Sequence, residues 1–257
     1  MRIALLIISA ALIVAGALVA GRVTAPSRVA HAAAASEPAD QTAMAKSIRA
    51  YLLANPEVLV EAMQELERKQ DSQRDATAQK VIQEKQAELF RDADSPTAGN
   101  PGGDVVIVEF NDYQCPYCKR THQAMKSVVG ADGKVKVIYK DLPILGEASK
   151  IAALAALAAV RQDKHQALHN ALMEYSGRLD RDKILEIAAS VGLDRAKLEK
   201  DMEDPKLKEI IERNLALATA LGVRGTPAFV VGKQFVPGAI DAAALRQLIA
   251  EARKSQG

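Results

Sequence analysis

The sequence predicts an α/β fold with a helical insertion, preceded by an α-helical N-terminal arm. Three apolar, β-branched runs indicate the strands of a buried sheet, namely Val105–Phe110, Val135–Tyr139 and Ala228–Val231. About 75 residues of helical composition, from 146 to 221, separate the second run from the third. Apolar residues at helical spacing also precede the first run, and they predict the arm.

The arm is expected over residues 41–95 as two short helices followed by a linker. Asn55, Pro56 and Glu57 are typical of a helix start, since Asn is a good N-cap, Pro fits the first helical position and Glu faces the positive end of the helix dipole. Residues 67–79 are almost wholly polar, which predicts a stretch that bridges solvent or flexes. The apolar positions are Ile48, Leu52, Leu53, Val58, Leu59, Ala62, Met63 and Leu66.

The apolar stripe of the arm needs a partner, because two short helices cannot build a core of their own. That partner is either the main domain or further copies of the chain. The polar stretch separates the stripe from the main domain, so the sequence favours copies and predicts a homo-oligomer. A helical arm folded back on the main domain is the alternative.

The main domain is expected over residues 100–257, with helices and strands in alternation. Gly102 and Gly103 end the linker directly before the first strand. Gly177, Gly192 and Pro205 divide the helical insertion into separate helices. Besides the three strands, the expected elements are helices over 116–129, 151–160, 183–191 and 207–221, a short strand at 235–236, and a closing amphipathic helix over 241–253.

The composition excludes several classes of function. The 34 basic and 32 acidic residues leave a net charge of +2, which gives no electrostatic case for a nucleic-acid partner. With only two cysteines, the chain has neither a framework of structural disulfides nor a four-cysteine zinc site. The two cysteines lie three positions apart, which is typical of a redox pair; two buried structural thiols are the alternative.

The first residues predict export. Arg2 is followed by an apolar run over residues 3–20, and small residues at 30–34 could be cut by a signal peptidase. Residues 1–34 are therefore a signal peptide, or a membrane anchor if they are not cleaved, since the run is about long enough to span a bilayer. In either case the rest of the chain would fold where disulfides persist.

The pair in Cys115-Pro116-Tyr117-Cys118 lies where the first strand gives way to a helix. Cys115 is expected at the helix N-terminus, where unpaired amides and the helix dipole stabilise a thiolate. Cys118 lies one turn further on and should point inward. Cys115 is thus predicted to be the exposed nucleophile and Cys118 the resolving thiol, with the pKa of Cys115 lowered.

Three segments together resemble the DsbA-like branch of the thioredoxin superfamily. They are the strand Val105–Phe110, the Cys115–Cys118 motif and Gly225-Thr226-Pro227-Ala228-Phe229, which opens the third strand. The resemblance implies a thioredoxin fold with a helical insertion, and a periplasmic thiol–disulfide oxidoreductase. It implies cysteine-containing substrate proteins and a membrane redox partner. We predict neither a cofactor nor a bound metal.

The resemblance also implies roles for single residues. Pro227 would be a cis-proline that faces the disulfide and exposes the Thr226 backbone to an extended substrate peptide. Pro116 and Tyr117, between the cysteines, would contact that substrate as well. Glu109, six residues before Cys115, matches a buried acid that could relay the proton of Cys118. Lys140, at the end of the second strand, is the expected partner of Glu109.

The arm, including Tyr51–Leu59, is similar to that of the ScsC proteins (suppressor of copper sensitivity C). That resemblance implies self-association, with a trimer favoured, and the rearrangement of wrong disulfides. Three functions therefore remain open: a disulfide isomerase, a dithiol oxidase of the DsbA type, and a copper-binding protein that uses the same thiols.

Three histidines are candidates for further ligands. His165 and His169 lie four residues apart in a helical segment, but no Glu or Cys completes a site nearby, so both are expected to be solvated. His122 follows Cys118 by four residues and could join the thiols in a Cu(I) site.

Overall fold

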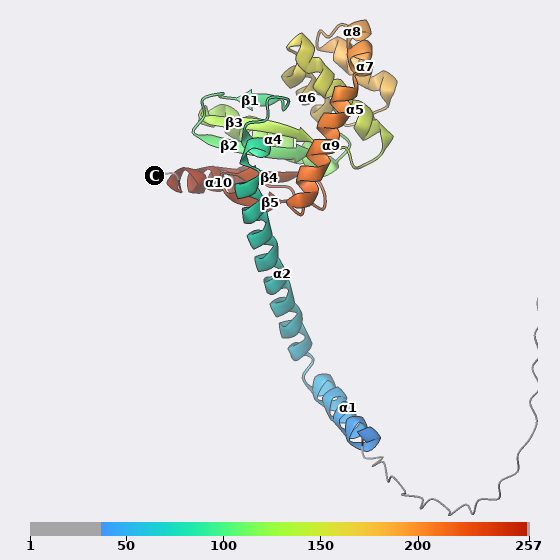
Figure 1. Cartoon of the computed structure of the whole chain (residues 1–257), viewed down its shortest axis with the longest axis vertical. Helices are drawn as coiled ribbons and strands as arrows, with labels where there is room; N and C mark the ends of the chain where they lie inside the picture. The colour runs from blue at the N-terminus through green and yellow to red at the C-terminus, as the bar shows by residue number, and fades with distance from the viewer. Residues whose placement is uncertain (1–36, 256–257) are drawn as a thin grey trace, which may run out of the picture. The chain divides into compact units, whose positions relative to one another are not determined.

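The arm forms two helices in the computed structural model, which describes residues 37–255. Helix α1 covers Glu37–Ala54 and helix α2 covers Glu57–Glu84 (Figure 1). Helix α2 continues without a break through the polar stretch at 67–79. Exposed ion pairs at helical spacing support that stretch, including Arg68 with Glu65 at 2.8 Å.

The junction between α1 and α2 differs from the prediction at Asn55. The side-chain amide of Asn55 donates to the main-chain oxygen of Tyr51 at 2.9 Å, so this side chain closes α1 instead of capping α2. The main-chain oxygens of Asn55 and Pro56 accept from the amides of Val58 and Leu59. Helix α2 therefore starts with a tight turn of the 3₁₀ type.

A five-stranded sheet forms the centre of the catalytic domain, with the strand order β1-β3-β2-β4-β5. Strands β2 and β3 are parallel, and the other neighbours are antiparallel. The strands are β1 (Thr97–Gly99), β2 (Val105–Asn111), β3 (Val135–Asp141), β4 (Ala228–Val231) and β5 (Gln234–Pro237). The sequence does not predict strand β1, because three residues are too few to show an alternating pattern. Its strand character comes from pairing with β3 at the edge of the sheet.

Helices cover both faces of the sheet. Helices α4 (Pro116–Asp132) and α10 (Ala242–Lys254) bury Met125 and Ile249 against one face. Helices α3 (Gln86–Phe90) and α9 (Pro205–Ala220) cover the other, together with the C-terminal end of α2. Residues Ile82 and Leu89, placed in the arm by the sequence, are buried in this second layer.

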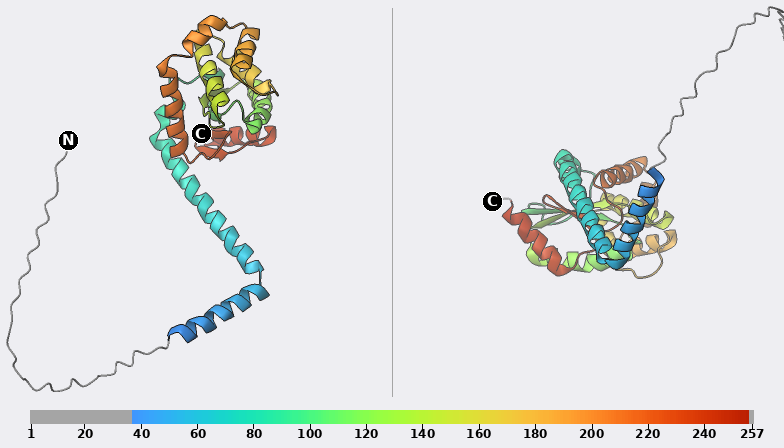
Figure 2. Two further views of the ribbon diagram at one scale, coloured as in Figure 1. Left: turned by 90° about the vertical axis from the view of Figure 1, so that its right-hand side faces the viewer. Right: turned by 90° about the horizontal axis from the view of Figure 1, so that it is seen from below.

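The helical insertion packs at one end of the sheet (Figures 1 and 2). Its core is rich in alanine. Two of its helices begin at an aspartate whose carboxylate accepts an amide, as Asp180 does from Lys183 at 2.9 Å. The insertion consists of α5 (Glu147–Ala159), a 3₁₀ turn (Val160–Gln162), α6 (His165–Glu174), α7 (Arg181–Ser190) and α8 (Arg195–Asp201). Helices α6 and α8 add to those predicted as separate elements.

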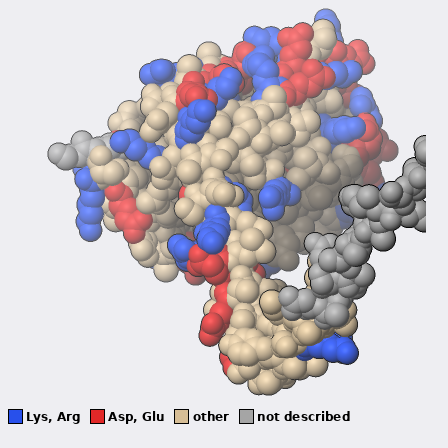
Figure 3. Space-filling model, turned by 60° about the horizontal axis from the view of Figure 1, so that its bottom comes forward, with Lys and Arg blue, Asp and Glu red and all other residues tan. Residues whose placement is uncertain are grey.

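Charged side chains of both signs lie near one another on one face of the molecule. Figure 3 shows Lys and Arg interspersed with Asp and Glu on the face in view, without a large field of one sign. Between residues 37 and 255, none of the helices has the length and apolar character needed to cross a membrane. The predicted signal peptide or anchor at 1–34 lies outside the described residues.

Candidate active site

Cys115 occupies the N-cap position of α4, and Pro116 is the first residue of that helix. Strand β2 and a short loop deliver it there, and its amide donates to the main-chain oxygen of Asp112 at 3.0 Å. The structure holds both cysteines as free thiols. Cys118 is fully buried on the inner side of α4, as predicted. Cys115 is only 4% exposed, so the expectation of an open nucleophile is corrected.

The cis-proline loop covers Cys115. The Thr226–Pro227 peptide bond is cis, and the Sγ atom of Cys115 lies 3.1 Å from the main-chain oxygen of Thr226. The main-chain oxygen of Pro227 is already engaged, because it accepts from the amide of Gly238 at 2.9 Å. The loop therefore brings the Thr226 main chain next to the sulfur of Cys115.

Hydrogen bonds separate the pKa values of the two thiols. The pKa of Cys115 falls from 9.0 to about 5, first because Cys118 donates to its sulfur, and then through Thr226 and the amides at the start of α4, against the opposing effect of burial. The pKa of Cys118 rises because it gives that hydrogen bond and because it is buried. At neutral pH, Cys115 is the thiolate and Cys118 keeps its proton.

This separation predicts a selective alkylation of the reduced protein. The rate of iodoacetamide reaction at Cys115 should follow a titration with its midpoint near pH 5, while Cys118 stays unmodified. Peptide mass mapping after short exposures at pH 4 to 9 measures both. In Cys118→Ala the hydrogen bond to the Cys115 sulfur is lost, so the midpoint should move upward. A midpoint above about pH 8 in the parent protein would contradict the assignment of Cys115 as a stabilised thiolate.

The two residues between the cysteines point outward. Pro116 is exposed, and the side chain of Tyr117 is 54% exposed with Arg120 stacked 4.9 Å from the centre of its ring. Ile144 and Leu145, on the loop before α5, are also exposed apolar residues. Tyr117 is therefore free to contact a polypeptide that reaches Cys115.

Asp112 fixes the active-site loop, although no motif in the sequence marks it. Its carboxylate accepts hydrogen bonds from the amides of Gln114 at 2.8 Å, Ile144 at 2.9 Å and Leu145 at 3.1 Å, and from the Ser149 hydroxyl at 2.7 Å. It thereby ties the loop before Cys115 to the loop that carries Ile144. A buried Asp directly after a predicted strand was the only available signal.

Glu109 is buried on the face of the sheet that α4 covers. It lies opposite Tyr139 of β3 and Phe229 of β4. It shares one face of β2 with Ile107, two residues earlier, which packs in the same layer as α4. Burial, with a smaller contribution from Asp141, raises the pKa of Glu109 from 4.5 to about 8. Glu109 is thus a neutral acid at pH 7 on the sheet face covered by α4, the helix that carries Cys118.

Lys140 is not the partner of Glu109. Lys140 pairs with Phe110, the residue after Glu109 in β2, so its side chain points to the opposite face of the sheet from that of Glu109. There its ammonium group donates to the carboxylate of Asp92 at 2.7 Å. Successive strand residues point to opposite faces, which rules out the expected pair.

The histidines form a buried group rather than a solvated helix surface. His165 and His169 are buried on α6, against the prediction, and His122 of α4 lies 5.3 Å from His169 between ring centres. The Tyr113 hydroxyl and Nδ1 of His169 share a hydrogen bond of 3.0 Å. Burial lowers the pKa of all three histidines, that of His165 to about 4, so the group is neutral.

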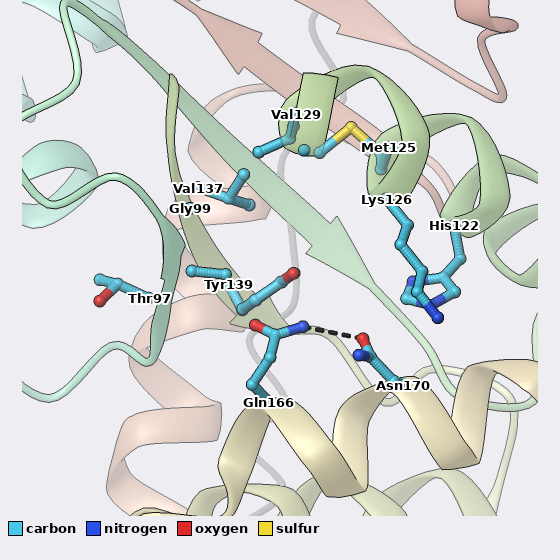
Figure 4. Close-up of a pocket in the computed structure, with 12 residues that line it drawn as sticks. Thr97, Gly99, His122, Met125, Lys126, Val129, Val137, Tyr139, Gln166 and Asn170 are labelled. Carbon is cyan, nitrogen blue, oxygen red and sulfur yellow. Dashed lines mark hydrogen bonds between the residues drawn. The ribbon is translucent and has the colours of Figure 1, made fainter. Parts of the chain in front are cut away.

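The histidine group borders a cleft of about 420 Å³ between α4 and α6. Figure 4 shows His122 and Lys126 of α4 facing Gln166 and Asn170 of α6 across it, with Tyr139 between them. The Gln166 amide donates to Asn170 at 2.8 Å. Within residues 37–255, no group of three or more His, Cys, Asp or Glu side chains is arranged to hold a metal ion, so His122 does not complete a site with the thiols.

The fold and the paired thiols define a thiol–disulfide oxidoreductase of the thioredoxin class. The chain belongs to the family of the DSBA-like thioredoxin domain, whose sequence profile matches residues 106–250. This match confirms the predicted thioredoxin fold with its helical insertion. The profile of the copper resistance protein ScsC N-terminal domain matches residues 40–73, which confirms the resemblance of the arm.

Solved structures agree with this family. The Proteus mirabilis ScsC linker deletion mutant is 32% identical, with a TM-score of 0.66, over 87% of this chain and 99% of that one. A thioredoxin-like oxidoreductase from Silicibacter pomeroyi is 46% identical, with a TM-score of 0.64, over 65% of this chain and 97% of that one.

The curated relatives include disulfide-exchange proteins and antiporters. The thiol:disulfide interchange protein DsbA of Bordetella parapertussis is 29% identical over 65% of this chain and 86% of that protein. The Na(+)/H(+) antiporter NhaA of Herminiimonas arsenicoxydans is 27% identical over 61% of this chain, but the match spans only 25% of the antiporter. Ion transport is therefore not inferred from it.

Proposed function

We propose that the chain is an exported disulfide isomerase that rearranges wrong disulfides through Cys115 and Cys118. The position of the Cys115 sulfur carries the exchange chemistry, since it lies 3.1 Å from the Thr226 carbonyl beside the cis-proline. The exposed apolar stripe of the arm favours isomerisation over simple oxidation, because an oligomer can hold one client between several active sites.

Isomerisation requires a reduced Cys115. Its thiolate attacks one sulfur of a client disulfide, so that the client S–S bond breaks, a Cys115–client disulfide forms and a client thiolate is released. A different thiolate of the same client then attacks the client sulfur of the mixed disulfide. A new client disulfide forms and the Cys115 thiolate leaves, so the exchange consumes no oxidant or reductant.

Cys118 ends exchanges that stall. Its thiolate attacks the Cys115 sulfur of the mixed disulfide, which releases the client reduced and leaves the pair oxidised. Because Cys118 keeps its proton at pH 7, a base must take that proton first. We assign this step to Glu109, in its ionised form, as the positioned acid–base group in the layer below α4.

The test of the function is the recovery of activity from misoxidised ribonuclease. The reduced protein should restore ribonuclease activity without added oxidant. A membrane redox partner in the periplasm would have to keep Cys115 reduced, so the steady-state redox state of Cys115 in cells is the second measurement. Recovery only when oxidant is supplied, with Cys115 oxidised in cells, would contradict an isomerase.

A dithiol oxidase is the second candidate, and the lowered pKa of Cys115 favours it. A stabilised thiolate favours the reduced form of the pair, which makes the corresponding disulfide a stronger oxidant. An oxidase would donate the Cys115–Cys118 disulfide to reduced clients, and the membrane partner would then return the pair to the disulfide form. Reduced hirudin or ribonuclease, oxidised stoichiometrically by the disulfide form, is the measurement that favours it.

The arm supports self-association, with a trimer as the favoured state. Four apolar side chains of α2 are half exposed or more on the described chain, namely Leu59, Val60, Met63 and Leu66. On α1, Met44, Ile48, Tyr51 and Leu53 are exposed to a similar degree. Burying such a stripe against copies of itself would remove several hundred Å² of apolar surface from water, an order-of-magnitude figure typical of a stable interface.

Replacing Leu59 and Met63 together with glutamate is expected to give a monomer. Both side chains are exposed, so the fold of the single chain should survive while the stripe gains charges that repel other copies. Light scattering measures the mass, and Gln64→Glu, on another side of α2, is the matched control. Isomerase activity should fall with the oligomer. A parent protein that is already monomeric would remove this support for the isomerase.

A further inference from the structure

A furrow begins at the cis-proline loop and has helix α2 as its second wall. Its first part, about 490 Å³ in volume, is lined by the loop from Gly222 to Ala228, with Phe235, Pro237 and Gly238, and by Asp71, Arg74 and Asp75 of α2. A second hollow of about 300 Å³ lies between α2 and strand β5. Asp75 and Phe235 border both hollows, so the two adjoin.

The position of this wall follows from the packing of α2. Ala78 and Ile82 are buried, and Ile82 packs in the layer of Val108 and Phe110. Asp71, Asp75, Ala78 and Ile82 are spaced three or four residues apart, so they share one helical face. The same face of α2 that packs in the domain core therefore carries Asp75 one turn earlier and Asp71 two turns earlier, where both line the furrow.

The charges of the furrow are only partly compensated. The carboxylate of Asp71 pairs with the guanidinium of Arg74 on the same helix. Among the described residues, no ion pair or hydrogen bond engages the side chain of Asp75, nor that of Arg224 on the loop wall. Arg224 lies near the cis-proline, two residues before Thr226. Asp75 lies further along the furrow, where the first hollow meets the second beside β5.

The furrow runs along the loop that contacts the reacting sulfur. Thr226 and Pro227 line it, and the Thr226 carbonyl lies 3.1 Å from Sγ of Cys115. A client held as a Cys115 mixed disulfide must place its cysteine beside Thr226. The residues on one side of that cysteine can then extend into the furrow, and a side chain several residues away reaches the α2 wall.

We propose that α2 is a specificity-determining wall, and that Asp75 selects client segments carrying lysine or arginine a few residues from the reacting cysteine. This proposal rests on the proposed disulfide exchange at Cys115 and adds its preferred substrate class. It also gives a role to the polar stretch of α2, whose carboxylates face the furrow without contributing to the core.

The experiment uses the full-length reduced protein and mixed disulfides between glutathione and short cysteine peptides. The peptides carry Lys, Gln or Glu at one position, moved from two to five residues away on either side of the cysteine. The rate of glutathione release gives a second-order constant for each peptide. On one side of the cysteine, Lys should exceed Glu by roughly two- to five-fold at low salt, as expected for an exposed ion pair, and less at high salt.

Two variants test the source of the preference. Asp75→Lys should reverse it in favour of Glu, a gain that mere damage to the fold cannot produce. Asp182→Asn removes the same charge from α7, where the Asp182 side chain is 93% exposed, and should keep the parent ratio. Equal rates for all peptides, or a Lys preference that survives in Asp75→Lys, would overturn the proposal. A parent protein that attacks no peptide disulfide would overturn the proposed function instead.

Discussion

Cys115→Ser is expected to reduce disulfide exchange to the uncatalysed background, because a serine hydroxyl is neither ionised at neutral pH nor able to form a disulfide. Cys118→Ser should behave differently. Its Cys115 thiolate can still attack a client disulfide, but the resolving thiol is gone, so mixed disulfides with clients should accumulate. The rate of recovery of misoxidised ribonuclease measures the first effect, and non-reducing gels with intact mass measure the second.

The pair of variants is its own control. Both remove one buried sulfur from the start of α4, where Cys115 and Cys118 are 4% and 0% exposed, so a general loss of packing would affect them alike. Only the assigned roles predict background activity in one and trapped clients in the other. Trapped clients on Cys118 in Cys115→Ser would reverse the assignment of nucleophile and resolving thiol.

The cysteine pair and the cis-proline loop could be predicted because their signals are local. Cys115, Pro116 and Cys118 are adjacent in the sequence, and a strand before them and a helix after them fix their geometry. Pro227 was recognised through its neighbours Thr226 and Ala228 at the start of a strand. The strand limits were also close to the prediction, since β-branched runs at buried positions leave few alternatives.

Residues whose role depends on tertiary contacts were harder to place. The sequence shows Lys140 as a cation near Glu109, but which face each occupies depends on the register of β2 with β3. His165 and His169 look like helix surface until α4 brings His122 against them. The role of Asp112 becomes visible only in the fold, where the amide of Ile144 donates to its carboxylate. Long-range packing decides each of these, and no local pattern encodes it.

Glu109→Gln is expected to raise the free energy of unfolding by about 3 kcal/mol at pH 7. The folded protein holds the Glu109 proton with a pKa of about 8, whereas the ordinary value is 4.5, so the unfolded chain releases that proton first. Stability is therefore lost as the pH rises from 4.5 to 8, at about 1.4 kcal/mol per unit. Denaturant unfolding should show almost no difference between the proteins at pH 4 and the largest difference at pH 9.

The same substitution should slow the release of clients, which separates a functional acid from a merely buried one. Glutamine cannot take the proton of Cys118, so its attack on the Cys115 mixed disulfide should slow roughly 10²-fold in single-turnover measurements. Asp141→Asn is the matched control, since burial raises the pKa of Asp141 to about 7 on the neighbouring strand. That variant should gain stability without slowing the release, because loss of the Asp141 charge lowers the pKa of Glu109 and leaves its carboxylate in place. If the parent protein and both variants release clients at the same rate, Glu109 takes no part in resolution. The substitution would then affect stability alone.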